Sequence, residues 1–197
     1  GVAPESKFLA YDGVSTGLVA SALRSAIYLG ADIVNNSWGA LDSQSGKGSY
    51  RTADPAWREA MTAAIGQGRR ARGSVVVFAA GNGGPNEDSN RDAYANHPGV
   101  LAVGAVDHRG RPSSYAEPGA NVLVSAPSMS LLRRSNGVAD IWTTDIAGPR
   151  GLSAGTSPGN ADYAAFAGGT SASAPMVSGV VALMLEANPS LSWRDVR

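Results

Sequence analysis

One long apolar segment constrains the fold of this chain more than any other feature. It runs from Val177 to Leu185 and is bounded by Pro175 on one side and Asn188-Pro189 on the other. The segment is too long for a typical strand, and its apolar residues would cover every side of a helix. The pattern therefore predicts a helix that is buried on all sides. Pro175 fits its first turn, because the N–H groups there have no intrahelical acceptor.

The residues that open this helix are small and polar, and they read AGGTSASAP. Ser171 lies among them, where free N–H groups and the positive end of the helix dipole would stabilise an oxyanion. Two interpretations follow from this stretch alone. Ser171 belongs either to an N-capping cluster of a core helix or to a catalytic site in which it is the nucleophile.

The composition excludes several classes of protein. The chain has 197 residues, enough for one α/β domain with a real core, and its 43% hydrophobic content with 25 glycines indicates a folded, turn-rich protein. The 16 Lys and Arg balance 16 Asp and Glu, so nothing points to nucleic acid or to an anionic membrane. There is no cysteine, which excludes disulfides and thiolate chemistry. No apolar run approaches the roughly 20 residues that a membrane span needs.

Strand-like and helix-like segments alternate along the chain. The segment at 74–80, SVVVFAA, is continuously apolar, as expected of a strand buried on both faces of a parallel sheet. Further strands are predicted at 7–11, 32–36, 100–106, 121–125 and 141–144, and helices at 16–29, from 55 to 66 or 68, after 167 and at the C-terminal end. The order predicts a single doubly wound α/β domain: a mostly parallel sheet with helices on both faces, in three layers. Ligands of such sheets bind at the carboxyl ends of the strands.

Two other segments carry structural predictions. The basic residues Arg69, Arg70 and Arg72 follow the second predicted helix, and they are expected to form a solvated helix end that complements the dipole. The Gly/Ser/Ala-rich residues from Arg150 to Phe166 are expected to form a mobile surface loop before the central helix.

Three short motifs stand at the ends of predicted strands or open the central helix: NNSWG at 35–39, AAGNGG at 79–84 and GTSASAP at 169–175. In this order and spacing they resemble the subtilisin-type serine peptidases, the subtilases. The motif SWG, the acidic loop after GNGG and the tail from GTSASAP to SWRDVR are similar to the kexin/furin-like branch of that family. The resemblance covers essentially the whole chain.

The resemblance assigns roles to five residues. Ser171 matches the nucleophile, and Asn82 matches the side-chain donor of the oxyanion hole, with the Ser171 backbone N–H as its partner. A neutral amide suits this role, since it can donate to a developing oxyanion without bringing a charge into the site. Ser37, Trp38 and Gly39 match the strand that binds an extended substrate backbone and forms one wall of the pocket for the residue before the cleaved bond.

Four acidic residues are relevant to substrate specificity and to metal binding: Asp42, Asp88, Asp92 and Glu117. In the resembling branch, the counterparts of Asp42 and Asp92 bind a basic substrate side chain, and those of Asp42, Asp88 and Glu117 hold calcium. Clustered carboxylates repel unless a hard cation or a guanidinium neutralises them. Matching Asp92 requires a one-residue gap in its loop. The alternative is that all four are ordinary solvated loop acids.

A base for the serine is missing from the sequence. The family's triad runs Asp, His, Ser along the chain, but neither His97 nor His108 lies in anything like the family's HGT motif. Both are expected to be surface loop histidines. The resemblance therefore implies that residues 1–197 are a partial subtilase peptidase domain, without the N-terminal segment that carries the Asp and His and without the C-terminal end. Alone, the chain is expected to be inactive.

Two hypotheses for the function remain open. In the first, the chain is part of a calcium-dependent serine endopeptidase that cleaves extended polypeptides after Arg or Lys. The resemblance then implies secretion to the exterior or the periplasm, with a bacterial source suggested by the absence of cysteine, and also a propeptide and a C-terminal β-domain. In the second, it is a non-catalytic, subtilase-like binding or structural domain. An α/β-hydrolase is disfavoured, because GTSAS does not match the G-x-S-x-G elbow.

Overall fold

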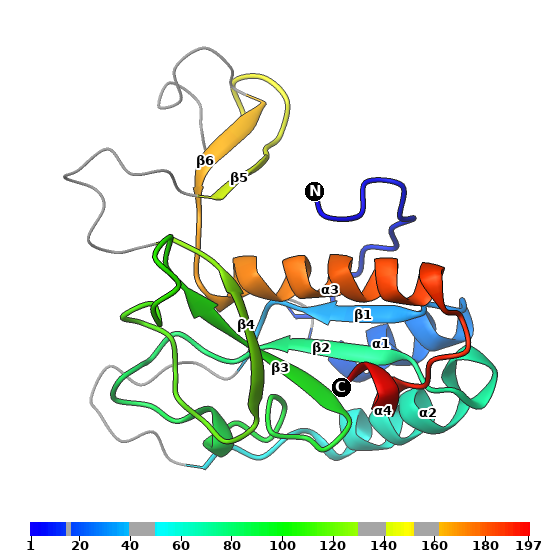
Figure 1. The fold of residues 1–197 in the computed structure, drawn as a ribbon. Helices are drawn as coiled ribbons and strands as arrows, with labels where there is room; N and C mark the ends of the chain where they lie inside the picture. Colours follow the sequence, from blue (N-terminus) through cyan, green and yellow to red (C-terminus); the bar gives the residue numbers. More distant parts are fainter. Residues whose placement is uncertain (15–16, 40–49, 130–140, 152–161) are drawn as a thin grey trace.

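A parallel sheet of four strands forms the centre of the molecule (Figure 1). The computed structural model describes residues 1–14, 17–39, 50–129, 141–151 and 162–197. The strands are β1 (Ile33–Asn36), β2 (Val75–Ala79), β3 (Val100–Val106) and β4 (Val122–Pro127), and they are hydrogen-bonded in the order β1-β2-β3-β4. All three pairings are parallel.

Helices cover both faces of this sheet. The helices α1 (Val19–Tyr28) and α2 (Pro55–Ala71) pack on one face, and α3 (Thr170–Ala187) crosses the other (Figure 1). Successive side chains of β2 alternate between the two cores: Val75 and Val77 contact the α3 side, whereas Val76 and Phe78 contact the α1 and α2 side. The predicted three-layer, doubly wound α/β fold is confirmed.

The central helix α3 is less buried than its sequence suggests. Val177, Val181 and Leu185 pack against the sheet, but Val180 and Leu183 are 48% and 45% exposed. The prediction of a helix buried on all sides is therefore wrong for this outward face. Among the described residues, α3 alone is long and apolar enough to cross a membrane, but its packing on β1–β4 is that of a core helix.

The predicted strand at 7–11 is absent. No described strand pairs with this segment, and Phe8 and Leu9 are 90% and 56% exposed. Apolar residues alone do not make a strand, because its N–H and C=O groups need a partner.

The prediction of a surface loop at 150–166 is also wrong at its C-terminal end. Tyr163–Ala167 forms β6, which pairs antiparallel with β5 (Ile141–Thr144). The β5–β6 ribbon projects beyond the N-terminal end of α3 (Figure 1). Residues 152–161 lie outside the described part of the chain.

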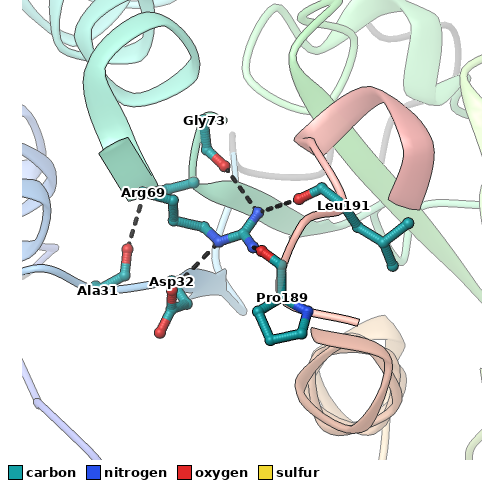
Figure 2. Close-up of polar contacts among 7 residues, drawn as sticks. Ala31, Asp32, Arg69, Gly73, Pro189 and Leu191 are labelled. Carbon is teal, nitrogen blue, oxygen red and sulfur yellow. Dashed lines mark hydrogen bonds and ion pairs between the residues drawn. The ribbon is translucent and has the colours of Figure 1, made fainter. Parts of the chain in front are cut away.

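Arg69 is an internal cross-link rather than part of a solvated helix end (Figure 2). The regular part of α2 stops at Gly68, and Arg69 and Arg70 have left-handed backbone angles. The Arg69 side chain is only 5% exposed and forms an ion pair with Asp32 at 3.2 Å. Its guanidinium also donates to the carbonyl oxygens of Leu191 at 2.8 Å and Pro189 at 3.3 Å. The start of β1 is thereby tied to the segment after α3.

The short helix α4 (Trp193–Val196) confirms the helix predicted at the C-terminal end. Ser192 and Asp195 form a capping box at its start. The hydroxyl and the backbone N–H of Ser192 donate to the Asp195 carboxylate and lower the pKa of that group.

Replacing Arg69 should destabilise the fold, whereas replacing its neighbour should not. We expect Arg69→Met to lower the free energy of unfolding by about 1.5–3 kcal/mol, because several carbonyl oxygens lose a charged donor. Arg70→Met is the matched control, since Arg70 is exposed. Urea denaturation of both variants measures the effect, and equal midpoints would show that the Arg69 contacts contribute nothing.

Candidate active site

A pocket forms where β1 and β2 end and α3 begins. It collects residues from five separate stretches of sequence, and seven of the residues singled out in the sequence line it: Trp38, Gly39, Asn82, Asp88, Asp92, Glu117 and Ser171. This is the edge of the sheet at which parallel strands present their carboxyl ends. Asp42 lies outside the described residues.

Ser171 lies in the first turn of α3, next to the end of β1. Its hydroxyl donates to the carbonyl oxygen of Ser37 at 3.3 Å, and the Ser37 hydroxyl donates in return to the carbonyl oxygen of Ser171 at 2.9 Å. The Ser171 backbone N–H belongs to the first helical turn, where no intrahelical acceptor exists. Ser171 therefore sits beside a free donor and at the positive end of the helix dipole.

The side chain of Asn82 is oriented by Thr170, the residue before Ser171. The Asn82 Oδ1 accepts from the Thr170 backbone N–H at 2.8 Å and from its hydroxyl at 3.1 Å. The Thr170 hydroxyl accepts in turn from the Gly81 N–H at 3.2 Å. With its oxygen held, Asn82 presents Nδ2 as a donor, and within the described part of the chain no residue accepts from it. Thr170 is not among the predicted site residues, although it stands inside the GTS motif.

Glu117 lies beneath the turn that carries Asn82. Its side chain is buried, and its Oε1 accepts from the Gly83 N–H at 3.0 Å. Gly81 has φ +114°, and a Cβ at this position would collide with the Glu117 carboxylate. Only glycine therefore fits here, and the close approach holds the turn in place.

Asp92 lines the pocket together with Trp38 and Gly39. Its Oδ1 accepts from the Tyr94 N–H at 2.8 Å, and its Oδ2 lies 3.1 Å from where a Cβ of Gly39 would be. The Trp38 ring packs edge-on against Phe78 and Tyr94, with ring centroids 4.9 and 5.1 Å apart. The residues predicted to bind the substrate side chain thus come together from two distant segments.

Asp88 is held by its own loop. Its Oδ1 accepts from the Asn90 N–H at 2.9 Å and from the Asn90 Nδ2 at 2.6 Å, which caps a short 3₁₀ helix, η1 (Ser89–Arg91). In the ranges that the structure describes, no three His, Cys, Asp or Glu side chains gather in a metal-binding arrangement. The predicted calcium ligands Asp88 and Glu117 both line the pocket, but their third partner, Asp42, is not described.

Several supporting residues could not be recognised from the sequence. Asn35 donates to the Ser37 hydroxyl at 3.0 Å and accepts from the Ser178 hydroxyl at 3.0 Å. On the other side, the Tyr115 hydroxyl donates to Ser128, whose hydroxyl donates to the Gly169 carbonyl oxygen, each at 2.8 Å. The only sequence signal is the position of Ser178, which is two helical turns after Ser171.

Neither histidine lies at Ser171. His108 is exposed, as expected of a surface loop residue. His97 is half-buried instead: its ring lies 5.5 Å from that of Trp57, and its Nδ1 accepts from the Gly99 N–H at 3.0 Å. Burial, together with the positive charge of Arg58, lowers the pKa of His97 below its ordinary value. His97 therefore lies in a loop, as predicted, but it is half-buried rather than fully at the surface.

The fold and the site define a class of protein. A parallel α/β sheet carries a serine at the start of its central helix, with an oriented amide donor at the end of a neighbouring strand. A family profile described as "Subtilase family" matches residues 1–197, and the chain belongs to this family.

Curated relatives place the chain in the kexin-like branch. It is 36% identical over 181 residues to the calcium-dependent protease of Trichormus variabilis, which covers 85% of this chain and 26% of the relative. It is 38% identical over 167 residues to kexin of Candida albicans, which covers 84% of this chain and 16% of the relative. The chain thus spans about a quarter or less of the length of these proteins.

Solved structures show the same fold. The Aeromonas sobria serine protease, in complex with the chaperone ORF2, matches with a TM-score of 0.66 at 25% identity, over 83% of this chain and 32% of that one. A protease of Pseudoalteromonas arctica matches with a TM-score of 0.64 at 26% identity, over 92% of this chain and 49% of that one.

Proposed function

We propose that this chain supplies the nucleophile, the oxyanion donors and the substrate pocket of a subtilisin/kexin-type serine endopeptidase. The observation that carries the proposal is the orientation of Asn82 by Thr170, directly beside Ser171. A donor that is fixed before the reaction stabilises developing negative charge without further reorganisation.

The chemistry follows from these positions. The Ser171 Oγ attacks the carbonyl carbon of the peptide bond, and the negative charge that develops on the carbonyl oxygen is stabilised by the Ser171 N–H and the Asn82 Nδ2. The proton of the Ser171 hydroxyl must pass to a base and then to the leaving amine as the C–N bond breaks, and water must then hydrolyse the acyl-serine ester. Since His97 and His108 lie elsewhere, this base belongs to a part of the protein outside residues 1–197.

An open strand edge and exposed apolar side chains support the proposal that residues 1–197 form a partial peptidase domain. One edge of β1 has no partner among the described strands. Large apolar side chains are also exposed on the N-terminal segment, α1 and α3: Phe8, Leu9, Leu18, Tyr28, Leu29, Val180 and Leu183. Such exposure is typical of surfaces that another part of a protein covers. In the complete protein, an N-terminal segment with the Asp and His of the triad, and a C-terminal end, would complete the domain.

The substrate in this proposal is an extended polypeptide with Arg or Lys before the cleaved bond. Residues 37–39 continue from β1 and offer backbone groups to an extended chain. Asp92 and Asp42 would bind the basic side chain through charge-assisted hydrogen bonds. Secretion by a bacterium, a propeptide and a C-terminal β-domain belong to the same proposal.

A non-catalytic, subtilase-like domain is the second candidate. The observation in its favour is that neither histidine of the chain contacts Ser171. The two candidates differ in whether the full-length gene product hydrolyses peptides.

The test compares the full-length gene product with the 197-residue chain on a fluorogenic arginyl peptide. We expect the full-length protein to cleave it and to be labelled at Ser171 by a serine-directed phosphonate. Ser171→Ala should lower kcat by about 10⁶, as in subtilisin, a member of the same family. An inert full-length protein would favour the non-catalytic domain, and robust turnover by the 197-residue chain would contradict the external base.

The oxyanion donor makes a second prediction. Asn82→Ala should lower kcat by about 10²–10³ and change KM little, because Nδ2 meets the oxyanion chiefly in the transition state. Thr170→Val should lower kcat in the same direction but less, since the hydroxyl that helps to hold Asn82 is lost, and Thr170→Ser is the matched control. A raised KM with unchanged kcat would show that Asn82 binds the ground state instead.

Calcium is the cofactor that we propose, with Asp42, Asp88 and Glu117 as its ligands. Carboxylate oxygens are the donors that calcium prefers, and the two described ligands line the same pocket. Bound calcium at about 100 times its Kd would add about 2.7 kcal/mol to the stability of the folded protein. We therefore expect a chelator to lower the Tm of the full-length protein.

Matched variants locate the calcium site. Asp88→Asn should reduce the chelator effect without changing the preference for basic residues, and Asp92→Asn should do the reverse. Asp42→Asn should weaken both, because Asp42 is assigned to both sites. A Tm that the chelator leaves unchanged would remove calcium from the proposal.

A further inference from the structure

The pocket contains a built-in cation that the sequence did not reveal. Arg51, from the segment before α2, lines the pocket, and its Nη2 lies 3.2 and 3.3 Å from the two carboxylate oxygens of Glu87. The Arg51 and Glu87 side chains are 24% and 6% exposed. A guanidinium is unexpected in a pocket proposed to receive a basic side chain, because like charges repel.

The backbone of Arg51 explains why its side chain enters the pocket. Its N–H donates to the Arg91 carbonyl oxygen at 2.8 Å, and its own carbonyl accepts from the Ala93 N–H at 3.1 Å. These two bonds align Arg51 in parallel with Asp92. The side chain then reaches Glu87 at the other end of the same loop. One residue thus fastens the loop that presents Glu87, Asp88 and Asp92 to the pocket.

The ion pair sets the charge of the pocket. Burying a carboxylate is costly unless a cation or several donors compensate it, and Arg51 supplies such a cation to the buried Glu87. The charged side chains that line the described pocket are Arg51, Arg91, Glu87, Asp88, Asp92 and Glu117. Neutralising Arg51 would make the net charge of these lining side chains more negative by one, and neutralising Glu87 would make it more positive by one.

We propose that Arg51 is a specificity-determining residue that limits the preference for basic side chains by holding Glu87 in an internal ion pair. The inference rests on the proposed endopeptidase function and deepens it. Arg51 contacts no reacting atom. It acts through Glu87, so an entering Arg or Lys side chain meets the remaining acids and not the Glu87 carboxylate.

A charge series in the full-length protein, in excess calcium, tests this assignment. The quantity measured is the ratio of kcat/KM for a peptide with Arg before the cleaved bond to kcat/KM for the same peptide with norleucine there. Arg51→Gln should raise this ratio about 3–10-fold, and Glu87→Gln should lower it by a similar factor. The double variant Arg51→Gln/Glu87→Gln restores a neutral pair, so its ratio should return to that of the unchanged protein. Arg51→Lys is the charge-preserving control.

A residue with a merely structural role would give a different result. All the variants would then lose stability and activity without any change in the ratio, which would overturn the inference. A ratio for the double variant that stays as high as that of Arg51→Gln would overturn it too, because the effect would not follow the charge of Glu87.

Binding of p-aminobenzamidine, followed by its fluorescence, separates this inference from the proposed function. The amidinium should bind about 3–10-fold more tightly to Arg51→Gln and more weakly to Glu87→Gln. If the full-length protein cleaves no peptide but its affinity for the amidine follows this order, the endopeptidase proposal fails and the charge inference stands. If it cleaves peptides but affinity and ratio are the same in all variants, the inference fails and the function stands. An amidine that binds to none of the variants also overturns the inference.

Discussion

The burial of β2 on both faces is the constraint on which the rest of the structure depends. Every side chain from Val75 to Ala79 is at most 6% exposed, and β2 pairs with β1 on one side and with β3 on the other. Because both cores share this strand, its carboxyl end is among the least movable points of the molecule. The turn at Gly81–Gly83 leaves from there, so the amide of Asn82 inherits the rigidity of the core, as a preorganised donor requires.

Elements whose burial is a property of their own sequence could be predicted, and those that depend on distant partners could not. The sequence predicts the strand at Val100–Val106 with its exact bounds, because a run of six apolar residues interrupted only by Gly104 admits few alternatives. The segment at 7–11 is nearly as apolar, but none of the described strands pairs with it. The prediction for Arg69 is wrong for the opposite reason. Its environment is formed by Asp32 and Leu191, both far away in the chain.

The residues of the candidate site also divide into those that the sequence predicts and those that depend on distant partners. Asn82 and Ser171 stand in short motifs, so their convergence could be expected from the sequence alone. Arg51 and Glu87 are 36 residues apart and belong to no motif, and only the backbone pairing of Arg51 with the 91–93 segment brings them together. Tyr115 and Ser128 likewise act through contacts that no spacing encodes. The charged contacts of the pocket therefore depend on tertiary structure, whereas Asn82 and Ser171 can be recognised from sequence motifs.

The reciprocal bonds between Ser37 and Ser171 have a mechanical consequence. The segment proposed to receive the substrate backbone and the turn that carries Ser171 are clamped to each other, and Asn35 and Ser178 extend the clamp two helical turns along α3. A polypeptide laid along residues 37–39 is then in fixed register with the Ser171 hydroxyl. The bond to be cleaved would then be selected by its distance along the substrate from this clamp.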